Sequence, residues 1–154
     1  MSISLRNFAP ADFETLYEID QLCYDPAIAY SRRELRDCLR FPGADCLVAE
    51  TQEQPLLKIA GFIVTARQKI WGHVVTIDVL EAYRRRGVAS MMLAEAERRL
   101  FAAGVRKVAL ETATNNDSAI AFWQKHAYRI RGTQKGYYPG GRDALSMSKA
   151  LEES

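Results

Sequence analysis

The sequence contains few of the residues from which metal and disulfide sites are built. It has two histidines, His73 and His126, and three cysteines, Cys23, Cys38 and Cys46, without a Cys-x-x-Cys spacing. An odd, unpatterned set of cysteines predicts neither a disulfide framework nor a zinc site, so we expect reduced and partly buried thiols. A lone histidine is more often a hydrogen-bonded structural residue than a ligand. We therefore expect no metal.

Long apolar runs and charge of one sign are also missing. No segment approaches the ~20 apolar residues of a membrane span, and residues 1–7 lack the apolar core of a signal peptide. A net charge of +2 is too small to favour nucleic acid, because acidic and basic residues are interspersed except at Arg84-Arg85-Arg86. We expect a cytoplasmic protein that binds neither membrane nor nucleic acid.

Two common nucleotide-binding motifs are absent as well. The sequence has no Gly-x-x-x-x-Gly-Lys-[Ser/Thr] and no Gly-x-Gly-x-x-Gly. The first absence disfavours a nucleoside triphosphatase, and the second disfavours a dinucleotide-dependent oxidoreductase.

What the sequence does contain is the size and patterning of one mixed α/β domain. Its 154 residues, 48% of them hydrophobic, suffice to bury a sizeable core, so we treat 1–154 as a single domain. Apolar periodicity predicts about seven strands and about four helices. The strands are expected at 3–8, 45–50, 57–67, 71–80, 105–112, 128–135 and 143–149, and the helices at 10–23, 31–40, 87–103 and 116–126.

Local signals support these boundaries. Ser31-x-x-Glu34 is a capping box, Gly104 is placed to end the third helix, and Gly61 marks a bulge or a close approach. Residues 52–55 read as a turn. The short links between the second, third and fourth strands predict an antiparallel meander, whereas the helix between the fourth and fifth strands predicts a parallel crossover.

The stretch from Thr76 to Ser90 reads as a strand end, a basic turn and the start of a long helix. The first N–H groups of such a helix and the positive end of its dipole face the preceding turn. Gly87 and Ala89 are small enough to let a ligand approach the main chain. The pattern favours an anion site, in particular a phosphate site, with an ordinary solvated connection as the alternative.

These motifs resemble a known family. Arg84-x-x-Gly87-x-Ala89 after Ile77-Asp-Val79, the Leu110-Glu111 strand, and Asn116-x-x-Ala119-Ile-Ala-Phe122-Trp-x-Lys-x-x-Tyr128 together resemble the GNAT superfamily of acetyl-coenzyme-A-dependent N-acetyltransferases, over about residues 3–151. The Tyr137-Tyr138-Pro139 loop is most similar to the branch that acetylates protein N-termini, including the ribosomal-protein alanine N-acetyltransferases. The resemblance implies a mixed, mostly antiparallel sheet that is splayed between its fourth and fifth strands, with acetyl-coenzyme A in the opening.

The resemblance also implies which residues hold the cofactor. The backbone of Ile77, Asp78 and Val79 would bond the pantetheine arm as an added strand would. Asn116 would help to fix the cofactor, with a role as an ordinary helix cap equally open, and Trp123 would form a wall of the site. The pyrophosphate would lie on Arg84, Arg85, Arg86, Gly87, Val88, Ala89 and Ser90.

For the chemistry, Glu111 is the candidate base, because it ends an otherwise apolar strand and matches the family's glutamate. The alternative is a structural ion pair with an arginine. Trp123 stands where the family often has a tyrosine that protonates the leaving thiolate, and an indole cannot do this. Either the thiolate leaves unaided, as a pKa of roughly 8.5 permits, or Tyr128 or Tyr138 serves. We expect Tyr128 to pack in the core, which leaves Tyr138 as the second catalytic candidate.

The acceptor is expected between two loops, here called the first lip (residues 24–30) and the second lip (residues 136–141). By resemblance, Asp25, Pro26 and Tyr30 of the first lip and Tyr137 and Tyr138 of the second flank a peptide, and aromatic rings with a polar tip suit one. Ordinary turn and core aromatics are the alternative, above all for Tyr30 and Tyr137. An α-amine, with a pKa near ~7.7–8.0 against ~10.4 for lysine, suits a single modest base.

The favoured hypothesis is thus an N-acetyltransferase, a monomer or weak dimer, that moves acetyl from acetyl-coenzyme A to a protein or peptide N-terminus by direct attack on the thioester. A small-molecule amine such as a polyamine, amino acid or antibiotic is one alternative acceptor, and acidic residues crowding the groove would support a polycation. A non-catalytic acyl-coenzyme-A sensor is the other alternative, because Trp123 replaces the usual acid.

Overall fold

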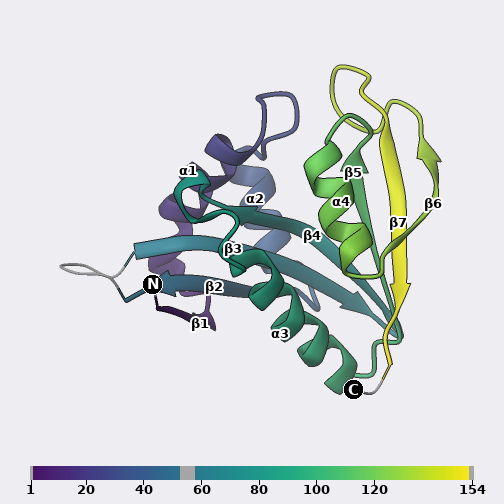
Figure 1. Cartoon of the computed structure of the whole chain (residues 1–154). Coiled ribbons are helices and arrows are strands. Elements are labelled where there is room, and N and C mark those ends of the chain that lie inside the picture. The colour runs from purple at the N-terminus through teal and green to yellow at the C-terminus, as the bar shows by residue number, and fades with distance from the viewer. Residues whose placement is uncertain (1, 53–57, 153–154) are drawn as a thin grey trace.

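The computed structural model describes residues 2–52 and 58–152, which form one seven-stranded sheet with helices on both faces (Figure 1). The strand order is β1-β2-β3-β4-β5-β7-β6. The strands are β1 (Ile3–Asn7), β2 (Asp45–Thr51), β3 (Lys58–Gln68), β4 (Trp71–Val79), β5 (Lys107–Ala113), β6 (Arg129–Gln134) and β7 (Ala144–Ala150). The helices are α1 (Phe13–Cys23), α2 (Arg32–Arg40), α3 (Val88–Ala102) and α4 (Asp117–Lys125), with short 3-10 turns η1 (Pro10–Asp12) and η2 (Glu81–Tyr83).

The predicted elements are confirmed, with boundaries shifted by at most a few residues. The first helix begins later than predicted, because Pro10 opens a 3-10 turn and the α-helix starts only at Phe13. The capping box is present: the Ser31 hydroxyl accepts from the Glu34 N–H, and Glu34 accepts from the Ser31 N–H. The turn expected at 52–55 and the expected strand start at Leu57 fall largely outside the described residues.

Strands β1 to β4 form the antiparallel arm of the sheet. Gly61 of β3 faces the backbone of β4 so closely that a Cβ atom at this position would lie 2.3 Å from the Asp78 carbonyl oxygen. This confirms the predicted close approach. Strand β4 also contains a bulge, since Thr76 and Val74 pair with successive residues of β3 and Val75 is left over.

The sheet splits between β4 and β5, as predicted. These two strands run parallel and pair only from Trp71–Lys107 to His73–Ala109. Beyond this point they diverge (Figure 1), while β5 remains paired with β7 along its whole length. The split leaves one edge of β4 and one edge of β5 facing an opening.

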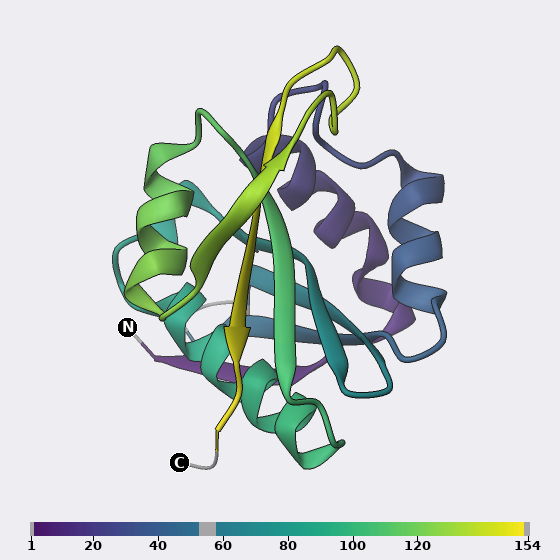
Figure 2. The same cartoon turned by 90° about the vertical axis from the view of Figure 1, so that its right-hand side faces the viewer.

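The two faces of the antiparallel arm carry separate cores (Figure 2). Helices α1 and α2 cover one face, where Leu16 and Leu35 pack against Val48 and Phe62. Helix α3 covers the other face, and its core continues through Trp123 of α4 to the β5–β7 arm. Because successive residues of a strand point to opposite faces, β2 and β3 contribute to both cores. This packing fixes the start of α3 beside the split.

The structure bears on the expectations for the cysteines and for membrane spans. The three cysteines are free thiols, and Cys46 is buried while Cys23 and Cys38 are half-buried, as predicted. Within residues 2–52 and 58–152, no helix is long and apolar enough to cross a membrane. The cytoplasmic location stays a prediction.

Candidate active site

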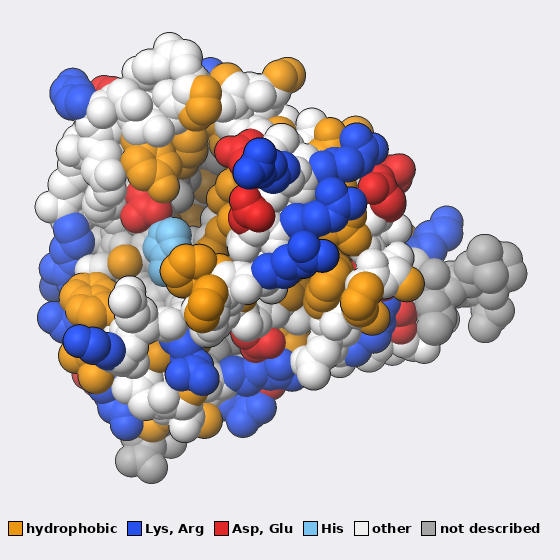
Figure 3. Space-filling view, turned by 180° about the vertical axis from the view of Figure 1, so that it is seen from behind, with side chains coloured by type: hydrophobic (Ala, Val, Ile, Leu, Met, Phe, Trp, Pro, Cys, Tyr) orange, Lys and Arg blue, Asp and Glu red, His pale blue; other side chains and the backbone are white. Residues whose placement is uncertain are grey.

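The split in the sheet opens into a cleft of roughly 630 Å³. In the space-filling view it is a hollow lined largely by hydrophobic side chains, with charged side chains around it (Figure 3). The predicted site residues that line it are Pro26, Tyr30, Ile77, Val79, Arg84, Ala89, Glu111, Asn116, Trp123, Tyr137 and Tyr138. The others, Asp25, Asp78, Arg85, Arg86, Gly87, Val88 and Ser90, do not line it.

The turn that enters α3 lies beside the cleft, which Arg84 and Ala89 of this segment line. Gly87 is the N-cap of α3 with a φ of 81°, and Arg85 also has a positive φ of 63°. A Cβ atom on Gly87 would meet nothing within 4 Å, so its face is open. The N–H groups of the first helical turn have no partner within the helix by helix geometry. The predicted anion site therefore has the backbone shape that it requires.

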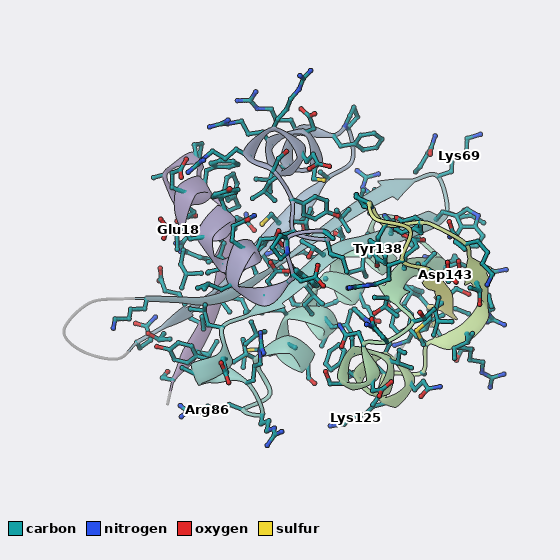
Figure 4. All side chains as sticks on the ribbon, turned by 90° about the horizontal axis from the view of Figure 1, so that it is seen from above. Glu18, Lys69, Arg86, Lys125, Tyr138 and Asp143 are labelled. Atoms are coloured by element: carbon teal, nitrogen blue, oxygen red, sulfur yellow. The ribbon has the colours of Figure 1, made fainter. Side chains whose placement is uncertain are left out.

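The arginine side chains of this turn lie differently from one another. Arg84 folds back over β4: its Nε donates to the Val79 carbonyl at 2.9 Å, and Nη2 lies 3.7 Å from the Cys23 sulfur. Arg86, two residues before the start of α3, lies far from Tyr138 (Figure 4). The Arg84 side chain therefore braces the strand.

At the centre of the cleft, Glu111 of β5 contacts a residue that sequence reasoning missed. Its Oε1 accepts a hydrogen bond from Nε2 of His73, 2.7 Å away on β4, and a second from the Tyr137 hydroxyl at 3.2 Å. His73 pairs with Ala109 in the parallel register, and Glu111 lies two residues further on the same face. The signal was available, because parallel pairing of the fourth and fifth strands brings this histidine to the split.

These contacts decide the charge of Glu111. Burial by itself raises the pKa of Glu111, but the hydrogen bond and charge of His73 and the hydrogen bond from Tyr137 outweigh it, so the pKa is lowered. Glu111 is therefore ionised at neutral pH and Nε2 of His73 carries the shared hydrogen. Both hydrogen bonds to Glu111 from described residues end on Oε1. Oε2 remains to accept a proton, and the arginine partner considered for Glu111 is replaced by His73.

The tyrosines of the second lip are protonated at neutral pH. Burial first, and then the negative charge of Glu111, raise the pKa of Tyr137 and of Tyr138 to about 12. Their rings meet edge to face, with centroids 4.9 Å apart. Of these two tyrosines, Tyr137 donates a hydrogen bond to Glu111, and Tyr138 lines the cleft beside it. The cluster thus offers phenol donors next to a carboxylate acceptor.

The α4 side of the cleft supplies structural residues. Asn116 caps α4, since its side-chain oxygen accepts from the Ala119 N–H at 3.2 Å, so the helix-cap role is present and the cofactor role stays a prediction. Trp123 is 4% exposed and packs edge-on against Phe122, forming a wall as expected. Tyr128 is buried and donates to Glu97 at 2.8 Å, as expected for a core residue.

The two lips lie at the same end of the molecule (Figures 1 and 2). Asp25 of the first lip forms an ion pair of 2.6 Å with Arg142, which directly follows the second lip and which sequence reasoning missed. In the first lip, the Tyr30 hydroxyl donates to the Val75 carbonyl at 3.3 Å, which holds this residue against the bulge of β4. Asp25 therefore links the lips, and does not line the cleft.

The fold and this cleft define a family. A model of the Acetyltransferase (GNAT) family matches residues 13–128, and the chain belongs to this family. Ard1 from Thermoplasma volcanium has a structure that matches with a TM-score of 0.88 and 26% identity, covering 99% of this chain and 100% of that one. The ribosomal-protein-S18-alanine N-acetyltransferase from Escherichia coli matches with a TM-score of 0.84 and 22% identity, covering 99% and 96%. The predicted fold is thereby confirmed.

Two relatives are similar in sequence to this chain over part of their own length. An N-alpha-acetyltransferase of Saccharolobus solfataricus is 37% identical over 81 residues, which are 52% of this chain and 48% of the relative. The uncharacterized protein ML0378 of Mycobacterium leprae is 30% identical over 157 residues, 97% of this chain and 41% of the relative. The chain thus spans about half the length, or less, of these relatives.

Proposed function

We propose that this protein transfers the acetyl group of acetyl-coenzyme A to the N-terminal α-amine of a protein or peptide. The observation that carries the proposal is the position of Glu111 in the cleft, where His73 and Tyr137 both contact its Oε1, while the Asp25–Arg142 ion pair bridges the lips. Membership of the GNAT family supports acetyl transfer, and relatives named N-alpha-acetyltransferase support the acceptor.

The donor half of the site would lie along the free edge of β4. Ile77 and Val79 line the cleft there, and the first turn of α3 offers N–H groups to the pyrophosphate. Asp78 contributes its peptide group only, because its side chain is buried away from the cleft. A structural neighbour at a TM-score of 0.84, NAA60 of Arabidopsis thaliana, was solved in complex with acetyl-CoA.

In the proposed reaction, Oε2 of Glu111 accepts a proton from the ammonium group, directly or through a water molecule. The amine nitrogen then attacks the thioester carbonyl, a C–N bond forms, and the C–S bond breaks with its electron pair on sulfur. Val75, the bulged residue of β4, lines the cleft, and its backbone N–H would be the donor for the oxyanion. The new C–N bond leaves the nitrogen positively charged, and the nitrogen releases its second proton, which passes through Tyr138 or water to the leaving thiolate.

His73 acts here as a positioning residue. By occupying Oε1, it leaves Oε2 as the accepting atom and keeps the carboxylate ionised within a half-buried site. A carboxylate whose pKa is lowered is a modest base, so it suits an α-amine better than a lysine amine.

The charges at the acceptor end do not favour a polycation. Of the described residues that line the cleft, the acidic ones are Glu34 and Glu111. Glu34 already accepts from the Ser31 N–H, and Glu111 accepts from His73 and Tyr137. Asp25 is paired with Arg142. A polyamine would find these carboxylates engaged.

A thiol-release assay on the intact chain tests the proposal. Acetyl-coenzyme A is incubated with peptides that have a free N-terminus, the same peptides with a blocked N-terminus and an internal lysine, and small amines such as spermidine and free amino acids. We expect thiol release with the free N-termini and little with the blocked peptides. Release only with small amines would overturn the acceptor, and tight cofactor binding without release on any amine would support the sensor instead.

A further inference from the structure

Two carboxyl groups are buried between α1 and β4, outside the cleft. Asp20 of α1 is 0% exposed and Asp78 of β4 is 1% exposed. Each has one oxygen with a partner: Oδ2 of Asp20 accepts from the Tyr30 N–H at 2.8 Å, and Oδ1 of Asp78 accepts from the Thr76 hydroxyl at 2.6 Å. The other two oxygens, Oδ1 of Asp20 and Oδ2 of Asp78, are inaccessible and have no such partner.

The two carboxyl groups lie within hydrogen-bonding reach of each other. Among residues 2–52 and 58–152, no lysine, arginine or histidine forms an ion pair with either one. Two ionised carboxylates in contact without a cation would be strongly unfavourable in a buried site. One proton between the two remaining oxygens satisfies both of them.

We propose that Asp20 and Asp78 share one proton, and that this protonated pair is a positioning device that ties the first lip of the acceptor site to the cofactor strand. Asp20 holds the backbone of Tyr30, and Asp78 adjoins Ile77 and Val79, which line the cleft. The functional part rests on the proposed acetyl transfer, and the shared proton does not.

Among the described residues, Arg84 is a cation that contacts neighbours of the pair, the Val79 carbonyl and the Cys23 sulfur, and it forms no ion pair with either carboxyl group. Burial raises the pKa of Asp78 well above its usual value, and the hydrogen bond and charge of Asp20 raise it further. Burial also raises the pKa of each titratable group that faces the pair, so all are neutral at pH 7. These groups are Cys23 and Tyr24 of α1 and the first lip, Tyr30, Cys38 of α2 and Cys46 of β2.

Close to the Asp20–Asp78 pair, two tyrosines connect the first lip to β4. The Tyr24 hydroxyl donates to the Ile77 carbonyl at 3.0 Å, and the Tyr30 hydroxyl donates to the Val75 carbonyl at 3.3 Å. Both tyrosines belong to the first lip, and both carbonyls belong to β4. Loss of the shared proton would place two negative charges between α1 and β4 and push these partners apart.

Infrared spectroscopy tests the shared proton without reference to activity. The wild-type protein should show the C=O stretching band of a buried, protonated carboxylic acid at pH 7, and Asp78→Asn should lack it, because the amide then donates to an ionised Asp20. No such band in the wild type at pH 7 would overturn the proposal, and this measurement needs no variant to fold.

Unfolding by urea gives a second test with a definite sign. The native pair holds one proton more than the unfolded chain, whose aspartates titrate near ~3.9. The unfolding equilibrium constant of the wild type should therefore rise about tenfold per pH unit relative to that of Asp78→Asn, from about pH 5 until the native pair loses its proton. Parallel pH dependences of the two proteins between pH 5 and 7 would contradict the proposal.

Kinetics separate positioning from general stability. Asp20→Ala removes the acceptor for the Tyr30 N–H and should raise the KM for the peptide about tenfold with little change in kcat. Asp20→Asn keeps that oxygen and should restore most of the affinity. If kcat falls in proportion to the folded fraction and KM is unchanged, the pair is merely structural. If the wild type shows no transfer, the proposed function fails while the spectroscopic result stands.

Discussion

Glu111 and Glu97 are two carboxylates of equal side-chain exposure, 17% each, with different surroundings. Glu97 of α3 has both oxygens engaged, by the Tyr128 hydroxyl and the Lys149 ammonium group. Glu111 has Oε1 engaged by His73 and Tyr137, and Oε2 has no hydrogen bond from the described residues. The contrast makes Glu97 a matched control for the role of Glu111 as a base.

We predict that Glu111→Gln lowers kcat by about 10²–10⁴-fold, because the amide keeps the shape but cannot take a proton. The Kd for acetyl-coenzyme A should change little, since Glu111 lies between the cofactor turn and the lips. Steady-state kinetics and calorimetric binding measure the two quantities. Glu97→Gln should leave kcat near the wild-type value, and an equal loss in both variants would sink the assignment.

The proposed positioning role of His73 predicts that this residue sets the pH at which Glu111 can act as a base. Replacement by phenylalanine removes the main influence that lowers the pKa of Glu111 and leaves the hydrogen bond from Tyr137 to oppose burial, so the pKa should rise. The acid limb of the pH profile of kcat/KM should then move to higher pH. Tyr137→Phe should move the acid limb in the same direction by less, because the hydrogen bond from Tyr137 is the smallest of the influences on the pKa of Glu111. An unmoved limb in His73→Phe would contradict the positioning role.

At the scale of elements, the turn before α3 and the turn after it allow a paired comparison. Gly87 and Gly104 both have a positive φ, 81° and 97°, and a Cβ on either would meet nothing within 4 Å. Alanine at either site should therefore cost a similar stability, about 1–2 kcal/mol, from backbone strain alone. The two glycines differ in that only Gly87 belongs to the proposed phosphate site.

We predict that Gly87→Ala weakens binding of acetyl-coenzyme A about tenfold, equivalent to ~1.4 kcal/mol, because the backbone and the new methyl group obstruct the phosphate. Gly104→Ala should bind acetyl-coenzyme A as the wild type does. Calorimetric titration and urea unfolding of both variants provide the comparison. Equal affinities in the two variants would remove the phosphate site from this turn.

The Asp25–Arg142 ion pair joins the two lips across the acceptor end. We predict that Arg142→Ala raises the KM for the peptide and leaves the KM for acetyl-coenzyme A unchanged, because the lips then close less firmly on the acceptor. The pair is exposed, so stability should change little. Lys135→Ala is the control, since Lys135 pairs with Asp143 within the same hairpin and not across the lips. A similar rise in KM in both variants would argue against the bridge.

At the scale of the molecule, the sheet consists of two arms that are joined through three residue pairs of β4 and β5 and through the core around α3. A ligand that fills the split contacts both arms in the folded state only. At 100 times its Kd, acetyl-coenzyme A should stabilise the protein by ~2.7 kcal/mol, which corresponds to a rise in Tm of roughly 5–10 °C. Differential scanning fluorimetry measures it, and Gly87→Ala should shift the response to higher ligand concentration.

Much of the fold was predictable because its signals are local. The capping box at Ser31 and the glycine at 104 set helix ends, and short links forced an antiparallel meander. The order of the last strands was not predictable, since β7 lies between β5 and β6 through contacts distant in sequence. In the site, Glu111 was predicted from its place at a strand end and from the family resemblance.

The missed residues share one physical cause. His73 reaches Glu111 through strand register, Arg142 reaches Asp25 across 117 positions of sequence, and Asp20 reaches Asp78 through the packing of α1 on β4. None of these pairings has a local signature. Their side chains acquire their roles only when the two arms and both lips are in place.

The split in the sheet also bears on aggregation. Exposed strand edges recruit other chains, and proteins protect them with charge, bulges or a covering element. Here, two unpaired edges face each other inside the cleft, and β4 carries a bulge at Val75. A second protein chain could extend the sheet at these edges only by entering the split between the two arms, where the pantetheine arm is proposed to lie. We therefore infer that the opening needed for a cofactor is shielded by the same geometry from β-sheet extension.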